Sequence, residues 1–279
     1  MNSGPPEQNE FRAPYEPKLS ENLLFPSKLG VMRLQSLAFL AISTLCFGLP
    51  SGQAGVTNPA EIPTPQGGWA TDRHQTKLNL EKSHQYDLLM LGDSITHNFE
   101  KPEYAPIWDK YFGSRNALDL GYSGARTENI LWNIANGELD GQSPKVVTLM
   151  IGTNNADETN YPTHHTGEQI AGGIRAIVRA VEKKLPHTKI LLLRCFPYGA
   201  EPDHNSRGIV LNRASEIAKK LANNRRVFWC DVNQVFLNPD GTMNRQLMPD
   251  LLHPSPEGAR KWAEAMEPLL SKLMGDKSR

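Results

Sequence analysis

The chain has 279 residues, of which 39% are hydrophobic, and its 30 basic and 30 acidic residues give a formal net charge of zero. This length fits one large domain or two small ones, and the hydrophobic content suffices for a full core. A balanced charge gives no electrostatic attraction to nucleic acid or to an anionic membrane surface. The composition therefore predicts a globular protein whose partner is small and weakly charged or neutral.

Residues 1–54 have the pattern of a polar extension followed by an export signal. Residues 1–31 are polar and show no apolar periodicity, which predicts a disordered or untranslated segment. Residues 32–54 begin with Met-Arg, continue with an apolar run too short to span a bilayer comfortably, and end in small residues. This pattern predicts a signal peptide cleaved after Ala54, with Met32 as the true start. The mature protein is expected in the periplasm or outside the cell, without stable membrane association; an uncleaved membrane anchor is the alternative.

The remaining chain divides into a short arm and one predicted domain, residues 81–274. Residues 55–80 contain several Pro and Gly and little periodicity, which predicts a linker or N-terminal arm. Apolar runs predict five β-strands, at 86–91, 117–120, 146–151, 190–193 and 227–230. Amphipathic patterns predict helices at 127–136, 167–185, 209–222 and 257–273. Such alternation indicates a parallel sheet covered on both faces, which is a three-layer α/β/α domain.

A serine follows the first predicted strand, in the segment Gly92-Asp93-Ser94. Ligands of parallel sheets collect at the carboxyl ends of the strands, where this segment lies. A hydroxyl at a strand-to-helix turn is exposed, and the positive end of the helix favours developing negative charge. Asp93 is expected to fix the turn by hydrogen bonds to backbone amides. Ser94 is the candidate nucleophile, although the pair by itself is more typical of helix capping.

The candidate acid-base pair is Asp250 and His253, just before the last predicted helix. A separation of three on a helical turn would place both side chains on one face. The carboxylate could then hold one ring nitrogen while the other faces the nucleophile. The alternative is a loop histidine beside a helix that Asp250 caps.

Two further strand ends carry candidate donors for an oxyanion hole. Gly124 lies in the segment after the second strand, and Asn154 follows the third. Gly124 lets a backbone N–H approach the substrate closely, Asn154 offers a side-chain amide, and the N–H of Ser94 completes the set. Each segment alone is ordinary turn chemistry, but all of them together at successive strand ends favour acyl transfer.

Several other residues are expected to have no catalytic role. His164 and His165 lack carboxylates or cysteines at ligand spacing, so a solvated loop is expected rather than a metal site. His97 is expected on a helix surface, and Arg126 is expected on a solvated rim, with substrate contact as the alternative. The cysteines that follow the signal, Cys195 and Cys230, could pair in an exported protein, but buried free thiols are favoured.

These segments together resemble the sequence blocks of the SGNH/GDSL hydrolase superfamily, whose name stands for Ser, Gly, Asn and His, here Ser94, Gly124, Asn154 and His253. Motifs such as Asn136-Gly137-Glu138-Leu139 and Ala171-Gly172-Gly173-Ile174 are similar to those of one branch, the catalytic subunits of intracellular platelet-activating-factor acetylhydrolase. The resemblance covers about residues 86–270. It implies a flavodoxin-like five-stranded parallel sheet, no metal and no cofactor, and it is compatible with a dimer.

Two features depart from that branch. Ala125-Arg126 stands where Asp-Thr commonly follows the glycine of the second block, and an export signal conflicts with an intracellular role. The sequence therefore favours a secreted serine esterase with a Ser94-His253-Asp250 triad that removes acetyl groups from an O-acetylated carbohydrate. The alternatives are an acetylhydrolase of phospholipids that resemble platelet-activating factor, and a catalytically silent carbohydrate-binding module.

Overall fold

The computed structural model describes residues 57–276. The predictions for residues 1–31 and 32–54 lie outside this part of the chain. Within the described residues, no helix is both long enough and apolar enough to cross a membrane.

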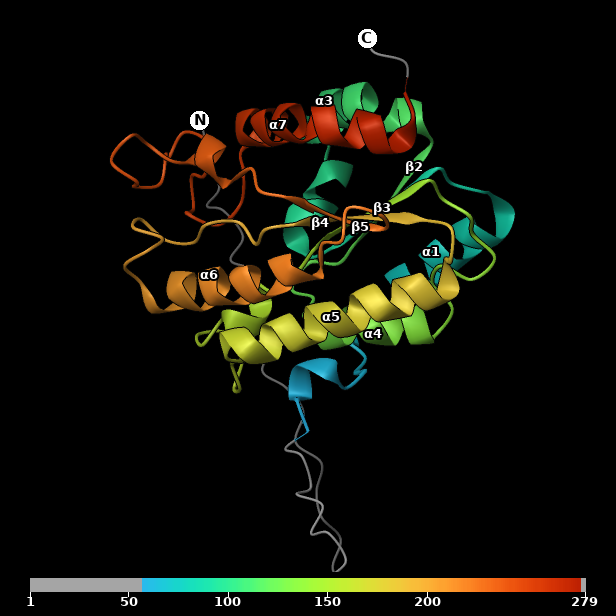
Figure 1. Ribbon diagram of the computed structural model, residues 1–279, viewed down its shortest axis with the longest axis horizontal. Helices are drawn as coiled ribbons and strands as arrows, with labels where there is room; N and C mark the ends of the chain where they lie inside the picture. The colour runs from blue at the N-terminus through green and yellow to red at the C-terminus, as the bar shows by residue number, and fades with distance from the viewer. Residues whose placement is uncertain (1–56, 277–279) are drawn as a thin grey trace, which may run out of the picture. The chain divides into compact units, whose positions relative to one another are not determined.

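Five parallel strands form the centre of the domain (Figure 1). They are β1 (Leu88–Gly92), β2 (Ala117–Gly121), β3 (Val146–Met150), β4 (Lys189–Leu193) and β5 (Val227–Cys230). Their order across the sheet is β2-β1-β3-β4-β5, and every neighbouring pair is parallel. The predicted fold class, a three-layer α/β/α domain with a five-stranded parallel sheet, is confirmed.

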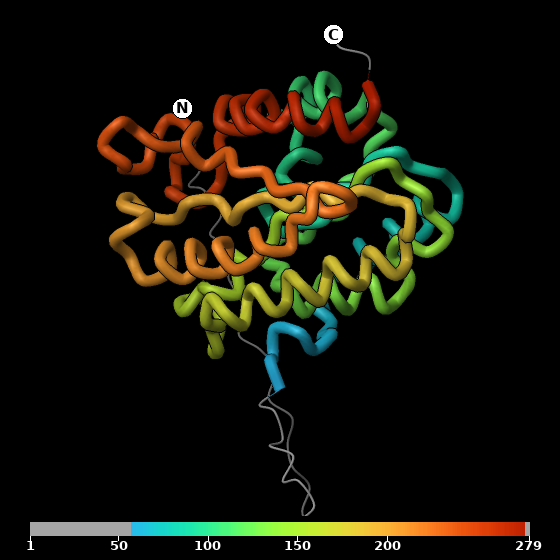
Figure 2. Tube along the Cα trace, in the orientation of Figure 1, coloured from blue at the N-terminus to red at the C-terminus, as the bar shows by residue number. Residues whose placement is uncertain are grey.

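Helices cover both faces of the sheet (Figures 1 and 2). One face carries α4 (Thr127–Ala135), α5 (Gly167–Lys184) and α6 (Ser206–Ala218), and the other carries α3 (Ala105–Tyr111) and α7 (Pro256–Met274). Side chains alternate along each strand, so Leu89 and Leu91 pack under α4 and α5, whereas Leu88 and Met90 pack under α3 and α7. This burial on both faces explains why the strands are continuously apolar.

The prediction of a linker over residues 55–80 is wrong from Trp69 onward, because α1 (Trp69–Ser83) occupies that stretch. Among the buried residues of α1 only Ala70 is apolar, and the others are His74, Lys77 and Glu81. They are held by polar partners from distant segments, such as Glu138 for His74 at 3.1 Å. A helix anchored in this way has no apolar period for a sequence pattern to reveal.

The remaining elements are short, and Cys195 and Cys230 are both free and buried, as favoured from the sequence. A four-residue helix, α2 (Ser94–His97), follows β1. The 3-10 turns are η1 (Pro59–Glu61), η2 (Asn98–Glu100), η3 (Pro102–Tyr104), η4 (Gly113–Arg115), η5 (Asn154–Ala156), η6 (Lys219–Leu221) and η7 (Asn233–Phe236).

The strand register places three candidate segments side by side. Gly92 at the end of β1 is level with Gly121 of β2 and with Met150 of β3. A Cβ atom on Gly121 would lie 2.4 Å from the backbone N of His97, so α2 approaches β2 more closely than a larger residue allows. The segments that contain Ser94, Gly124 and Asn154 therefore leave the sheet at one edge.

Candidate active site

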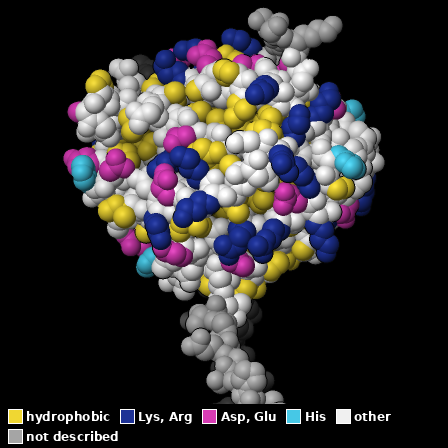
Figure 3. All heavy atoms as spheres, in the orientation of Figure 1, with side chains coloured by type: hydrophobic (Ala, Val, Ile, Leu, Met, Phe, Trp, Pro, Cys, Tyr) yellow, Lys and Arg dark blue, Asp and Glu magenta, His cyan; other side chains and the backbone are white. Residues whose placement is uncertain are grey.

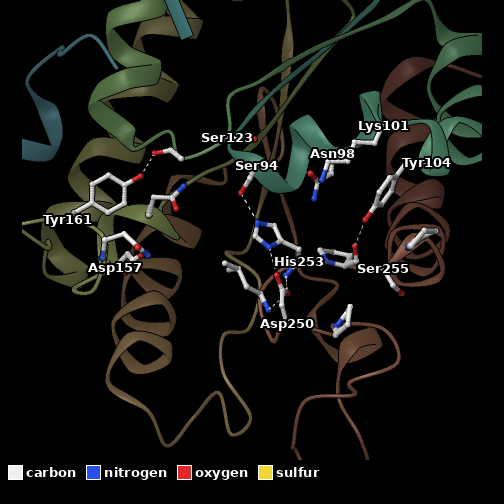
Figure 4. Close-up of a pocket in the computed structure, with 17 residues that line it drawn as sticks. Ser94, Asn98, Lys101, Tyr104, Ser123, Asp157, Tyr161, Asp250, His253 and Ser255 are labelled. Atoms are coloured by element: carbon white, nitrogen blue, oxygen red, sulfur yellow. Dashed lines mark hydrogen bonds and ion pairs between the residues drawn. The ribbon is translucent and has the colours of Figure 1, made fainter. Parts of the chain in front are cut away.

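Ser94 is the first residue of α2, and Asp93 alone separates it from the end of β1. Asp93 caps this helix: its Oδ1 accepts a hydrogen bond of 3.0 Å from the N–H of Ile95. Asp93 is fully buried, and burial raises the pKa of its carboxyl to about 6, although the Ile95 hydrogen bond opposes the shift. The cap therefore fixes the start of α2, and the Ser94 side chain extends from it into the cleft (Figure 4).

Ser94, His253 and Asp250 form a hydrogen-bonded chain (Figure 4). Ser94 Oγ lies 2.9 Å from His253 Nε2, and His253 Nδ1 lies 2.7 Å from Asp250 Oδ2. An ionised carboxylate can only accept, so His253 donates its Nδ1–H to Asp250. Nε2 is then left as the acceptor for the Ser94 hydroxyl.

The Asp250–His253 pair is not on a helical turn, which corrects the predicted geometry. Residues 249–255 form a loop before α7, and Leu251 has a left-handed backbone with φ of 64°. Asp250 Oδ1 accepts from the backbone N–H groups of Leu252 at 3.0 Å and His253 at 2.7 Å. This side-chain turn folds His253 back over Asp250, which achieves the contact that a helix was expected to provide.

Asp250 stays ionised in this arrangement. Partial burial alone would raise its pKa, but the hydrogen bonds from the His253 backbone and ring outweigh burial and lower the pKa below the ordinary value. The carboxylate is therefore available to orient the ring and to balance a positive charge on it.

The candidate oxyanion donors lie beside Ser94. Gly124 has a left-handed φ of 78°, and no carbonyl among residues 57–276 accepts its N–H. Asn154, in η5, donates one amide hydrogen to Ala125 O at 2.9 Å, which leaves the second hydrogen available. Gly124, Asn154 and Ser94 all line one cleft, and the N–H of Ser94 is a first-turn amide without an intrahelical acceptor.

Three side chains brace the loop that carries Gly124. Tyr161 donates to Gly124 O at 2.5 Å, Gln66 donates to Ser123 O at 2.6 Å, and His97 Nδ1 lies 3.0 Å from Ser123 Oγ. His97 is half-buried rather than on the surface as expected, and burial lowers its pKa to about 4, assisted by the nearby Arg73 charge. At neutral pH the loop therefore rests against an uncharged imidazole.

Two expectations about surface residues are wrong. His165 and Arg126 are both buried, and Arg126 Nη2 lies 2.6 Å from His165 Nδ1. Asn155 Nδ2 is 2.9 Å from the same nitrogen, and its Oδ1 accepts from the N–H of Thr127. These residues join the segments that follow β2 and β3. They therefore hold in place the two segments that carry Gly124 and Asn154.

The loop after β3 is also held by a buried ion pair. Arg207, near the start of α6, donates to Thr153 O at 2.9 Å and lies 3.2 Å from Asp157 Oδ2. Its guanidinium also stacks over the Tyr198 ring at 4.1 Å. Asn154 follows Thr153 directly, so Arg207 fixes the backbone that presents the Asn154 amide.

The triad opens into a cleft of about 870 Å³. Polar side chains, several of them labelled in Figure 4, and apolar groups contribute about equally to its walls. Three lining residues that sequence reasoning missed are Asn98, Lys101 and Tyr161. Asn98 could have been found, since it is four residues after Ser94 and so shares its helical face. Tyr161 lies in a loop whose path no local pattern predicts.

No group of three or more His, Cys, Asp or Glu side chains within residues 57–276 could hold a metal ion. The view in Figure 3 shows basic and acidic side chains spread over the same face.

Comparison with known proteins now settles the family. The model of the GDSL-like lipase/acylhydrolase family matches residues 90–261, more than half of the chain. The chain belongs to this family. Platelet-activating factor acetylhydrolase IB subunit alpha1 of Homo sapiens is 32% identical over 231 residues, covering 79% of this chain and 93% of the relative. The Rattus norvegicus alpha2 subunit is 32% identical over 228 residues, with the same coverage. The sequence resemblance is confirmed, and this GDSL-family chain is a carboxylic ester hydrolase.

Solved structures share the fold of this hydrolase. The crystal structure of an acetyl xylan esterase superposes with a TM-score of 0.56 at 21% identity and covers 66% of this chain and 99% of that one. An acetylxylan esterase of Geobacillus stearothermophilus gives a TM-score of 0.51 at 18% identity and covers 70% and 97%. At these identities the similarity establishes the α/β fold and no finer property.

Proposed function

We propose that this hydrolase removes short acyl groups, acetyl above all, from O-acetylated carbohydrates, with Ser94 as nucleophile. The observation that carries the proposal is the continuous Ser94-His253-Asp250 chain, with contacts of 2.9 Å and 2.7 Å, which lines an open cleft. This is the arrangement that nucleophilic catalysis requires, with a hydroxyl, a base within reach and a group that orients the base.

Acylation begins when Ser94 Oγ attacks the ester carbonyl carbon and its proton moves to His253 Nε2. The oxyanion of the tetrahedral intermediate is stabilised by the N–H groups of Ser94 and Gly124 and by the free amide hydrogen of Asn154. Asp250 stabilises the resulting imidazolium. The intermediate then collapses, His253 gives the proton to the departing alkoxide, and the alcohol leaves an acylated Ser94.

Deacylation repeats these steps with water. His253 Nε2 takes a proton from a water molecule as its oxygen attacks the acyl carbon, and the same three donors stabilise the second oxyanion. The proton then returns to Ser94 Oγ as the carboxylic acid leaves. Atoms balance as one ester and one water giving one acid and one alcohol, without a cofactor.

The walls of the cleft favour a polyhydroxylated alcohol over a lipid chain. Hydroxyl and amide groups come from Asn98, Ser123, Asn160 and Tyr161, and apolar surface of similar extent comes from Leu252, the prolines and the tyrosine rings. A hydrocarbon chain in such a cleft would leave those polar groups without partners, which costs free energy. The phospholipid alternative is favoured by one observation, the 32% identity to platelet-activating factor acetylhydrolase subunits.

The test is hydrolysis of p-nitrophenyl acetate, followed by longer acyl chains and then by acetylated oligosaccharides against acetylated ether phospholipids. We expect turnover that falls as the acyl chain lengthens, and a higher kcat/KM for the oligosaccharides. Higher kcat/KM for the phospholipids would support the alternative substrate. Binding of oligosaccharides without any turnover would support a silent carbohydrate-binding module instead.

Export stays a proposal that depends on the sequence of residues 32–54 alone. We propose that the mature protein begins at or near Gly55 and functions outside the cytoplasm. N-terminal sequencing of the protein from its native host tests this, and a cytoplasmic product with residues 1–31 intact would contradict it.

A further inference from the structure

One wall of the cleft continues the helical face of the nucleophile. Asn98 and Lys101 follow Ser94 by four and seven residues, across α2, η2 and the turn into η3, and both line the cleft. Figure 4 places Asn98 between Ser94 and Tyr104, with its amide pointing into the space above His253 and Ser255. Neither residue belongs to the triad or to the candidate oxyanion hole.

Asn98 is a buried amide without a protein partner. Its exposed fraction is 7%, and no hydrogen bond to its side chain exists within residues 57–276. Its amide atoms are not among the fully buried unpaired side-chain atoms of residues 57–276, so they remain open to solvent or to a ligand. The exposure that remains to Asn98 is in the cleft, where a ligand can supply both an acceptor and a donor.

Lys101 is the charge of the cleft that lacks a counter-ion. The other lining groups that carry charge are paired: Asp157 with Arg207 at 3.2 Å and Asp250 with His253 at 2.7 Å. Lys101 is exposed and has no ion pair in the described part of the chain, and no other Lys or Arg lines this cleft. A lone ammonium group beside a buried amide favours an anionic oxygen ligand.

The segment that carries this wall is joined to the loop that carries His253. The Tyr104 hydroxyl donates to Pro254 O at 2.8 Å, which ties η3 to the residue after His253. His253 delivers its proton to the departing oxygen, so the alcohol must lie on the His253 side of the Ser94 oxygen. Asn98 and Lys101 line the same cleft as Ser94 and His253, so groups on that alcohol face this wall.

We propose that Asn98 and Lys101 form a binding subsite for the leaving alcohol, specific for an alcohol that bears an anionic oxygen group. Asn98 hydrogen-bonds a hydroxyl near the ester, and Lys101 pairs with the anion. The anion is a carboxylate, as in an acetylated uronic acid, or a phosphate, as in an acetylated glycerol phosphate. This subsite rests on the proposed acetylesterase function and narrows its substrate class.

The test compares a charged and an uncharged sugar ester and adds a third substrate that carries a phosphate. The acetyl esters of methyl glucuronoside and methyl glucoside have the same sugar ring, and acetyl glycerol phosphate adds the phosphate arm. For the wild type we expect kcat/KM to favour the anionic sugar on the order of tenfold, as expected for one charge-assisted hydrogen bond. The Lys101→Met substitution should abolish this preference, Lys101→Arg should retain it, and high salt should reduce it.

Two further variants distinguish the loss of this subsite from effects that the loss of any surface charge would cause. Lys220→Met removes an exposed charge outside the cleft and should retain the wild-type preference. Asn98→Ala should raise KM for both sugar esters on the order of tenfold, because it removes a contact with the alcohol itself. Of the two anionic substrates, the acetylated glucuronoside and acetyl glycerol phosphate, the one with the higher wild-type kcat/KM shows whether the anion is a carboxylate or a phosphate.

A second measurement keeps the inference independent of turnover. Methyl glucuronoside and methyl glucoside, which are not esters, are titrated into the wild type and Lys101→Met proteins by NMR. Tighter binding of the anionic sugar to the wild type alone supports the subsite. Equal binding of the two sugars, or an unchanged preference in Lys101→Met, overturns it. Failure to hydrolyse p-nitrophenyl acetate would instead refute the proposed function, and the titration would still decide on the subsite.

Discussion

Ser94 Oγ lies 2.9 Å from His253 Nε2, although 159 positions separate the two residues in the sequence. Ser94 follows strand β1, which lies between β2 and β3, and His253 precedes α7, which packs on the same face of the sheet as α3. The Tyr104–Pro254 hydrogen bond of 2.8 Å joins the two segments beside the pair. The contact between Ser94 and His253 is therefore a product of the whole fold.

Substitutions in the triad should separate proton transfer from orientation. We expect Ser94→Ala and His253→Ala each to lower kcat on the order of 10⁴-fold or more, because they remove the nucleophile or its base. Asp250→Asn should leave more activity, since Asp250 orients the ring without transferring a proton. Steady-state kinetics with p-nitrophenyl acetate measure all three. Ser206→Ala, an exposed serine at the start of α6, is the control, and near-normal turnover by pure Ser94→Ala would refute the mechanism.

The adjacent residues Asn154 and Asn155 should show opposite effects when each is replaced by Ala. Asn154→Ala removes one oxyanion donor, so kcat should fall roughly 10² to 10³-fold while KM hardly moves. Asn155 is fully buried and bonds Thr127 and His165, so Asn155→Ala should lower the melting temperature more than Asn154→Ala does. The measurements are kcat per titrated active site and a melting curve of the same sample. An unchanged kcat in Asn154→Ala would show that the Asn154 amide has a structural role and is not an oxyanion donor.

The buried cap Asp93 should make stability depend on pH. Its pKa in the folded protein is about 6, above the ordinary 3.8, so its stabilising contribution is full below the ordinary value and lost as the pH rises through about 6. About half of this contribution is already lost at pH 5, so the free energy of unfolding should fall by about 1.4 kcal/mol, relative to Asp93→Asn, between about pH 5 and about pH 8. Denaturant unfolding of both proteins at these pH values measures the difference. Parallel pH profiles for the two proteins would show that Asp93 is not the titrating group.

The Arg207–Asp157 ion pair should contribute to stability because both side chains are buried, with 8% and 6% of their surface exposed. Arg207→Met leaves the Asp157 carboxylate without its counter-ion, which should lower the free energy of unfolding by about 3 kcal/mol. The double variant Arg207→Met/Asp157→Asn should recover part of this loss, since it removes the uncompensated charge. Urea unfolding gives the values, and a double variant no more stable than Arg207→Met alone would contradict this account.

The strands and the long helices could be predicted because their apolar residues follow the period of the structure. Buried strands such as β3 are continuously apolar, and α5 has an apolar face that begins at Ile170. Helix α1 could not be predicted in this way. Its buried side chains His74, Lys77 and Glu81 are compatible with burial only because Glu138, Glu100 and the N–H of Leu139 pair with them, and those partners are distant in the sequence.

The site shows the same division between local and distant determinants. Ser94, Gly124 and Asn154 each follow a strand, so a local motif was enough to locate them and the parallel sheet brings them together. The backbone between Asp250 and His253 was predicted wrongly because the left-handed Leu251 is not a residue type that signals such a turn. The buried positions of Arg126 and His165 depend on each other, so neither residue alone indicates burial.

The most direct test of the account is to trap the acyl group on the enzyme. Wild-type protein is mixed with p-nitrophenyl acetate, quenched in acid during turnover, digested and examined by mass spectrometry, with Ser94→Ala treated in parallel. The account predicts one acetyl group on the peptide that contains Ser94, released on further incubation before the quench, and none on that peptide in the variant. Turnover of the ester by the wild type without an adduct on Ser94, together with the same turnover in Ser94→Ala, would contradict it.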